Sequence, residues 1–177
     1  MTNEHVILVD KNDAPQGLME KMEAHEKGLL HRAFSVFVFN DQGDFLIHRR
    51  AAHKYHSGGL WTNACCSHPR DNETPEEAAH RRLQEEMGFD CPLQKAFEFT
   101  YRSELDNGLT EHEYDHVFLG TFNGVPELNP EETDAYKYIS REELLRDVKE
   151  NPGNYTEWFK IALNEVLNFK TSTSKDC

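Results

Sequence analysis

The segment Ser67–Phe89, SHPRDNETPEEAAHRRLQEEMGF, predicts a helix because capping residues stand at both of its ends. Thr74 and Glu77 have the spacing of a capping box, and Pro75 stands at the first helical position. Gly88 stands where a C-terminal cap belongs. One apolar stripe is expected to form the buried face: Ala79, Leu83 and Met87.

The same helix carries two stripes of paired charge. Arg82 and Glu86 lie together on one stripe, and Arg81 and Glu85 lie on the other, because residues four apart are neighbours on a helix surface. On most helices such pairs form a solvated face laced with ion pairs. A second interpretation, in which these charges have a functional role, depends on the segment before the helix.

Strand signals lie on both sides of this helix. Residues 34–50 predict a β-hairpin, with a β-prone run at Phe34–Phe39, the turn sequence NDQG and a return at Phe45–Arg49. A second strand-rich region covers residues 95–105 and 109–122, on either side of a turn.

Two further helices are expected near the C-terminus. One begins at a second capping box, formed by Ser140 and Glu143. The other covers about residues 155–169 and carries an apolar stripe, namely Phe159, Ala162, Leu163, Val166 and Leu167. Strands and helices that intermix in this way indicate a mixed sheet flanked by helices, and periodicity leaves α/β and α+β both open.

Length and composition indicate an ordinary globular protein. At 177 residues we expect one domain over residues 1–170, with a flexible polar tail at 171–177. No basic leader begins the chain and no segment approaches the roughly 20 apolar residues that a membrane helix needs, so we expect a cytoplasmic protein without membrane contact. The net charge of −13 argues against a general nucleic-acid binder, although a local cluster of Lys and Arg is compatible with a small anionic ligand.

Two of the four cysteines are adjacent, in WTNACCSHP at residues 61–69. Adjacent cysteines rarely bridge each other, and the lack of a C-x-x-C pair argues against a structural zinc finger. Cys65 and Cys66 are therefore either buried core or thiols kept reduced for chemistry. Cys177 lies in the polar tail and is expected to be a bystander.

The quoted segment resembles the Nudix box, in which a glycine is followed after five residues by Glu and after seven more by R-E-U-x-E-E-x-G-U, where U is aliphatic. Seven positions match: Glu73, Arg81, Leu83, Glu85, Glu86, Gly88 and Phe89. Ser67 replaces the opening Gly, and Arg82 replaces the Glu after the Arg. In Nudix hydrolases that Glu belongs to the carboxylate cluster that holds magnesium, so a cation there weakens a mechanism based on metal-activated water.

This altered box is similar to that of the type I isopentenyl-diphosphate isomerases, a branch of Nudix-fold proteins. The resemblance covers nearly the whole chain through motifs in the same order: EHVILVD, LMEKMEAH, LHRAFSVFVFN, RRA, LWTNACCSHP and EHEYDHVF. It implies a Nudix-like mixed sheet and an enzyme of isoprene biosynthesis that interconverts isopentenyl and dimethylallyl diphosphate. The alternatives are a Nudix hydrolase of nucleoside diphosphate derivatives and a non-catalytic binding module.

The reaction of that family requires one proton to be added to a carbon of the substrate and another to be removed from the allylic carbon. Cys66 matches the family's catalytic thiol, and we expect a lowered pKa to make its thiolate available. Strand alternation places Glu111 and Glu113 on one side of the sheet. The resemblance makes Glu113 the proton relay and Tyr101 the aromatic acid that assists it.

Two metal sites follow from the same resemblance. The first would hold one Mn²⁺ or Zn²⁺ on a set of imidazoles and carboxylates, namely His25, His31, His68, Glu111 and Glu113. At the second, Glu86 would hold a Mg²⁺ that bridges the protein and the substrate diphosphate. Three other histidines are expected at the surface: His53, His56 and His80.

Cations for the diphosphate are found at four positions that match the family, namely Lys21, Arg50, Lys54 and Arg82. Trp158, and with less support Trp61, is expected beside the hydrocarbon end, where an aromatic face stabilises positive charge. The expected partner is thus a small isoprenyl diphosphate, with no nucleic acid or membrane partner, and we expect a monomer or a weak dimer.

Overall fold

The computed structural model describes residues 4–175, with side chains to residue 170. Its sheet is built around β3 (His31–Phe39). Along one edge β3 pairs in parallel with β8 (Thr110–Thr121), from His31 opposite Glu113 to Phe39 opposite Thr121. Along the other edge it pairs antiparallel with three strands: β1 (His5–Val9), β6 (Cys65–Ser67) and β4 (Phe45–Arg50).

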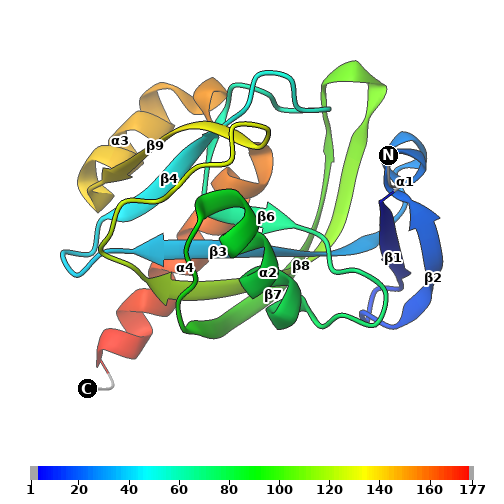
Figure 1. Ribbon diagram of the computed structural model, residues 1–177, viewed down its shortest axis with the longest axis horizontal. Coiled ribbons are helices and arrows are strands. Elements are labelled where there is room, and N and C mark those ends of the chain that lie inside the picture. Colours follow the sequence, from blue (N-terminus) through cyan, green and yellow to red (C-terminus); the bar gives the residue numbers. More distant parts are fainter. Residues whose placement is uncertain (1–3, 176–177) are drawn as a thin grey trace.

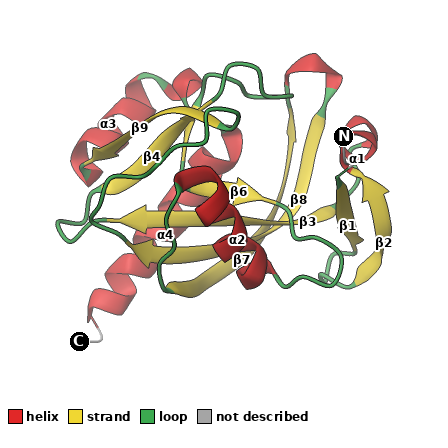
Figure 2. Ribbon diagram, viewed as in Figure 1, coloured by secondary structure: helices red, strands yellow, loops and turns green. Residues whose placement is uncertain are grey.

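The remaining strands extend these pairings into one mixed sheet (Figures 1 and 2). They are β2 (Pro15–Glu20) beside β1, β5 (Trp61–Thr62) and β9 (Thr133–Ile139) beside β4, and β7 (Leu93–Glu104) beside β8. The predicted hairpin at 34–50 and the strand pair at 95–122 are confirmed as β3–β4 and β7–β8.

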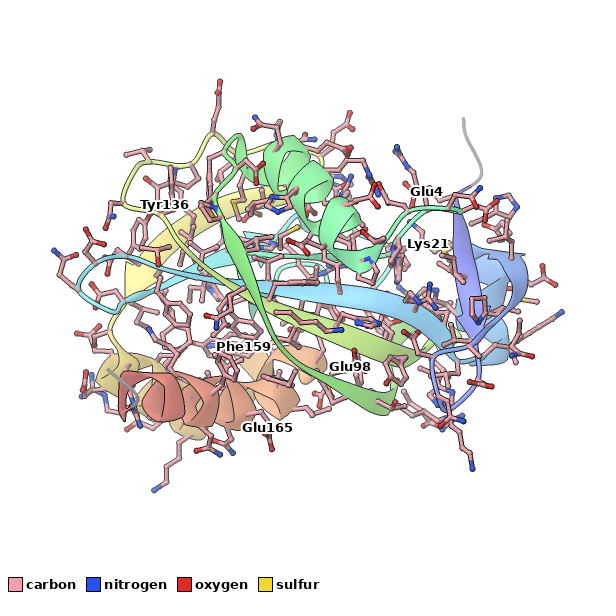
Figure 3. The ribbon with its side chains drawn as sticks, turned by 90° about the horizontal axis from the view of Figure 1, so that it is seen from below. Glu4, Lys21, Glu98, Tyr136, Phe159 and Glu165 are labelled. Carbon is pink, nitrogen blue, oxygen red and sulfur yellow. The ribbon has the colours of Figure 1, made fainter. Side chains whose placement is uncertain are left out.

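Helices cover both faces of the sheet. Figure 3 shows the sheet lying between α2 (Pro75–Met87) and α4 (Glu157–Lys175), with Phe159 directed at the sheet and Glu165 away from it. α3 (Arg141–Glu150) packs with α4, and α1 (Lys21–Lys27) follows the β1–β2 hairpin at one end of the sheet (Figure 1). Two short 3-10 turns complete the described chain, Asp106–Gly108 and Pro152–Asn154.

β3 is buried on both faces, which explains its nearly continuous apolar run. Phe37 and Phe39 pack toward α3 and α4 in one core, whereas Val36 and Val38 pack toward α2 in a second core. The alternation follows from the two-residue period of a strand. The mixed sheet flanked by helices that the sequence predicts is therefore confirmed.

The residues that cap α2 are those predicted from the sequence. The Thr74 side chain accepts from Glu77 N while the Glu77 side chain accepts from Thr74 N, and Gly88 has a left-handed φ of 70°. At α3, Ser140 Oγ accepts from Glu143 N. α4 continues past the predicted end to Lys175, so part of the predicted tail is helical, and Cys177 lies outside the described residues.

The sequence analysis did not predict α1 or the β1–β2 hairpin. α1 has only seven residues, and the side chain that caps it belongs to Glu20 rather than to one of the usual capping residues. Within residues 4–175 no helix has both the length and the apolar character that crossing a lipid bilayer would require.

Removing the α2 cap should destabilise the fold measurably. Thr74→Ala leaves the Glu77 amide without its side-chain acceptor, and we expect a loss of about 1 kcal/mol in the free energy of unfolding. Thr74→Ser keeps the acceptor and serves as the control. Urea unfolding should separate the two variants, and equal stability would contradict this role of the cap.

Candidate functional site

Three imidazoles and two carboxylates meet at the end of the sheet. His25 Nε2 lies 2.9 Å from Glu111 Oε1, and His31 Nε2 lies 3.3 Å from the same oxygen. On the other carboxylate, Glu113 Oε2 lies 2.9 Å from His68 Nε2 and 3.4 Å from His31 Nε2. The structure thus brings together all five residues of the predicted His/Glu site, from α1, β3, β8 and the residue after β6.

The backbone orients two of these rings. His25 Nδ1 donates to Lys21 O at 2.7 Å, and His31 Nδ1 donates to Leu29 O at 2.9 Å. Their Nε2 atoms are therefore directed at the carboxylates, which is the arrangement usual for histidines that ligate metals. As predicted, alternation along β8 buries Glu111 and Glu113 together.

Burial and ion pairing oppose each other in this cluster. Burial lowers the pKa of His31, but hydrogen bonds with Glu111 and Glu113 outweigh burial and raise that pKa to about 10. At His68 burial prevails and lowers the pKa to about 4. Burial would raise the pKa of Glu111, yet hydrogen bonds from the surrounding imidazoles hold it well below its usual range. The ionised carboxylates therefore stabilise positive charge on His31, whereas His68 stays neutral because burial dominates there.

The cluster fits a single cation. One ligand atom from each of His25, His31, His68 and Glu111 lies within 4.8 Å of the others. His25 Nε2, His31 Nε2 and Glu111 Oε1 are buried without a well-directed hydrogen bond, so their lone pairs and protons are poorly satisfied by the protein alone. Imidazole and carboxylate donors suit Zn²⁺ or Mn²⁺. Glu113 contacts two of these imidazoles and lies beside this group of four.

His56 corrects one prediction. It was expected at the surface, but its side chain is 2% exposed and its Nε2 lies 3.1 Å from Glu111 Oε2. The short turns of residues 51–59 direct His56 toward Glu111, and no periodic pattern in the sequence predicts this. His53 is exposed as predicted, whereas His80 is half-buried with its Nδ1 2.6 Å from Asp90 Oδ1.

A small cavity next to the His/Glu cluster contains the predicted reacting groups. Cys66, Glu113 and Trp158 all line it, together with Tyr55 and His56, which the sequence analysis missed. The Tyr101 hydroxyl donates to Glu113 Oε1 through a short hydrogen bond. Trp61 lies elsewhere, half-buried against the core around α4.

β6 separates the two adjacent thiols. Cys66 is paired with Ser35 and lines the cavity, while Cys65 is paired with Val36 and is buried in the core that faces α2. Cys65 Sγ donates to Glu86 Oε2 at 2.7 Å. The lowered pKa expected for Cys66 is not found, because burial raises the pKa of the thiol despite the opposing charge of Arg50.

A second cavity gathers the predicted cations around Glu86. Its lining includes the four predicted cations, namely Lys21, Arg50, Lys54 and Arg82. Cys66 and His68 line both this cavity and the small cavity that contains Glu113. Acidic partners hold these cations: Lys54 Nζ lies 2.6 Å from Glu132 Oε2, Arg82 lies 3.2 Å from Glu132 Oε1, and Lys21 Nζ lies 2.7 Å from Glu4 Oε2. Neither Glu4 nor Glu132 was assigned a role from the sequence: Glu4 begins the EHVILVD motif without a stated function, and Glu132 lies outside the motifs.

The charges of α2 divide between two roles. Arg81 forms a bidentate pair with Glu73 at 2.8 and 2.9 Å, which ties the helix to the loop before it. Arg82 instead lies 3.2 Å from Glu86 Oε1 and faces the cation cavity. The solvated-face interpretation thus describes Arg81, and the functional interpretation describes Arg82.

Comparison with known proteins agrees with this geometry. The model of the NUDIX domain matches residues 29–159. Isopentenyl-diphosphate Delta-isomerase 2 of Aromatoleum aromaticum is 51% identical over 95% of this chain and 89% of its own length. Isopentenyl-diphosphate Delta-isomerase of Pectobacterium atrosepticum is 49% identical over 93% of this chain and 92% of its own length. This chain belongs to the NUDIX family, in the branch of the isopentenyl-diphosphate Delta-isomerases.

Solved structures support the NUDIX fold. A protein from Deinococcus radiodurans superposes with a TM-score of 0.70 at 21% identity, over 84% of this chain and 90% of its own. An Ap4A hydrolase from C. elegans superposes with a TM-score of 0.58 at 17% identity, over 80% of this chain and 98% of its own. At these identities the likeness concerns the fold alone. The replacement of the Glu of the NUDIX box by Arg82 therefore changes the site and leaves the fold unchanged.

Loss of one imidazole should lower the affinity of the His/Glu cluster for metal. In His25→Ala we expect the affinity for Mn²⁺ or Zn²⁺ to fall by about 10-fold or more, since one bond to the ion is removed. His53→Ala, at an exposed histidine, is the control. Elemental analysis after dialysis against a chelator would measure this, and full occupancy in His25→Ala would rule out the cluster as the metal site.

Proposed function

We propose that this chain interconverts isopentenyl diphosphate and dimethylallyl diphosphate. The observation that carries the proposal is that Cys66 and Glu113 line one small cavity, adjoining a second cavity lined by four cations and Glu86. A five-carbon chain between a thiol and a carboxyl is what a double-bond shift requires, because one group gives a proton and the other takes one. The curated relatives carry the name of this activity at about half identity.

The cations would bind the diphosphate, which is unchanged by the reaction. Lys21, Arg50, Lys54 and Arg82 provide charge-assisted hydrogen bonds, and Arg82 and Lys54 would exchange Glu132 for phosphate oxygens. Glu86 is the carboxylate that would hold a Mg²⁺ between the protein and the phosphates, where the ion would neutralise their charge. Binding at this end fixes the hydrocarbon end in the cavity beside Cys66.

Protons would move between the substrate and the two facing groups. Toward dimethylallyl diphosphate, Glu113 adds a proton to the terminal alkene carbon, with Tyr101 hydrogen-bonded to it, and Cys66 removes one from the allylic carbon. Burial raises the pKa of Cys66, while the neighbouring imidazoles lower the pKa of Glu113 against the effects of burial and of Glu111. In this direction the reaction requires a proton on Glu113 and a thiolate at Cys66.

Two other features would support the reaction. Trp158 is 4% exposed and lines the cavity, where its ring would stabilise a carbocation by about 0.5–2 kcal/mol. A Mn²⁺ or Zn²⁺ in the His/Glu cluster would supply a fixed positive charge next to Glu113.

The thiols of Cys65, Cys66 and Cys91 are free, which supports the cytoplasmic location expected from the sequence. A monomer or weak dimer remains a prediction.

One assay tests the function directly. Purified protein with Mg²⁺ and isopentenyl diphosphate should form dimethylallyl diphosphate without releasing phosphate. Product analysis by chromatography and a phosphate assay follow the two outcomes. Phosphate release without isomer formation would show that the chain is a hydrolase.

The thiols provide a second test. Cys66→Ala should abolish isomerisation with little change in folding, because among the cysteines of residues 4–170 Cys66 alone lines the cavity beside Glu113. Cys65→Ala removes the neighbouring thiol on the opposite face of β6 and should remain active. Turnover by Cys66→Ala at the rate of the unmodified chain would refute its catalytic role.

Arg82 separates isomerase from hydrolase. For an isomerase, Arg82→Ala should raise KM by roughly 10-fold or more, since a charge-assisted contact contributes about 1.5–3 kcal/mol. Arg82→Glu should be worse than Arg82→Ala, because it places an anion against the diphosphate. In a hydrolase Arg82→Glu would instead restore the NUDIX carboxylate cluster, so a rise in nucleotide hydrolysis in this variant would identify the other enzyme.

A further inference from the structure

Three side chains fasten the β1–β2 hairpin to its neighbours on the face of the sheet opposite to His31, which we call the outer face. Asp13 stands in the turn of the hairpin. Arg32, on β3, donates through Nε to Asp13 Oδ1 at 2.8 Å and through a terminal nitrogen to Asp13 O at 2.7 Å. His116, on β8, lies with its Nε2 2.9 Å from Asp13 Oδ2. We call Asp13, Arg32 and His116 the outer clamp.

The outer clamp is shielded from water. The side chains of Arg32, Asp13 and His116 are 14%, 20% and 5% exposed. On the other side of the ring, Lys95 Nζ and Glu98 Oε2 each lie 3.1 Å from His116 Nδ1, so both ring nitrogens have a polar partner and the ring is held in place. Partly buried charge-assisted bonds of this kind are stronger and more directional than surface ion pairs.

The backbone at Asp13 suits this role. Its φ is 65°, in the left-handed region, which Asp and Asn tolerate better than other residues with a Cβ. The turn therefore presents a carboxylate and a carbonyl of the same residue toward Arg32. Asp10, in the same turn, uses its carboxylate differently and accepts from the amides of Asn12 and Ala14.

The hairpin that the clamp holds carries two groups of the site. β2 ends at Glu20 and leads directly into α1, which supplies Lys21 to the cation cavity and His25 to the His/Glu cluster. In Figure 3, Lys21 and Glu4 lie near each other at this end of the molecule. β1 itself pairs with β3 at one position, Leu8 opposite His31, with a further backbone hydrogen bond from Val9 N to Leu30 O, so the strand pairing between them is short.

The clamp and the site also share their supporting strands. Arg32 directly follows His31 on β3, and His116 lies three residues after Glu113 on β8. Alternation along a strand sends Arg32 and His31 to opposite faces. Any tilt of the hairpin against the outer face would therefore displace α1 relative to the carboxylates on the inner face.

We propose that the outer clamp positions α1, so that Asp13, Arg32 and His116 act through Lys21 and His25 rather than on the substrate. They are positioning residues. The roles of Lys21 and His25 in this inference rest on the proposed function, whereas their placement by the clamp does not.

The experiment compares variants within one turn. Asp13→Gly removes the carboxylate and still accepts a positive φ, Asp13→Asn keeps an acceptor for Arg32, and Asp10→Asn is the matched control. Mn²⁺ and pyrophosphate are the probes, followed by titration, and hydrogen exchange reports on α1 against β3 and β8. Asp13→Gly should weaken the binding of both probes by about 5-fold or more and speed exchange in α1. Asp13→Asn should lose less affinity for both probes than Asp13→Gly does. Asp10→Asn should bind the probes and exchange hydrogen in α1 like the unmodified chain.

A partner variant makes the test specific. Arg32→Met should reproduce Asp13→Gly, and the double variant should bind the probes no worse than either single one, because both break the same contact. Unchanged binding of both probes in Asp13→Gly would overturn the proposal. Equal loss of exchange protection in α1, β3 and β8 would also overturn it, since that pattern means general destabilisation. If the unmodified chain fails to isomerise, the proposed function fails, yet these binding and exchange data still decide on the clamp.

Discussion

The parallel pairing of β3 with β8 is the constraint on which the site depends. Parallel neighbours cannot be joined by a tight turn. The chain between β3 and β8 therefore includes several elements, among them β4, β6, α2 and β7, and the two paired strands lie far apart in the sequence. That register sets His31 opposite Glu113. On the other edge of β3, the pairing of Ser35 with Cys66 brings in the thiol. The acid, the thiol and the imidazole are thus arranged by one strand.

Buried charge is tolerated here because each carboxylate has several partners. Glu111 is 3% exposed and lies within 3.3 Å of nitrogens from three imidazoles. A carboxylate in such surroundings without partners would cost several kcal/mol to bury. The cluster therefore combines carboxylates and imidazoles, a donor set suited to a cation, and the neighbouring cavity is lined by Lys and Arg side chains suited to an anion. In a chain of net charge −13, this local separation of charge is what makes a diphosphate site possible.

Local signals in the sequence were sufficient to predict the helices and strands that have clear capping residues or a clear hydrophobic period. The capping box of α2, the two strand pairs and the inward alternation of Glu111 and Glu113 follow from residue spacing alone. The resemblance to a family identified the histidines and cations, and the structure brings them together. His56 escaped prediction because its burial depends on how an irregular loop turns inward. The raised pKa of Cys66 also escaped, because desolvation depends on packing from distant segments.

The division of α2 into separate stripes has a consequence for how such enzymes diversify. Ala79, Leu83 and Met87 secure the helix to the sheet, whereas Arg82 and Glu86 line the cavity that also contains Lys21, Arg50 and Lys54. A charge reversal at position 82 would leave the packing residues untouched, so the charge that faces the cavity can vary without the loss of a stable fold. Variation of the site and maintenance of the fold are therefore carried by different sides of one helix.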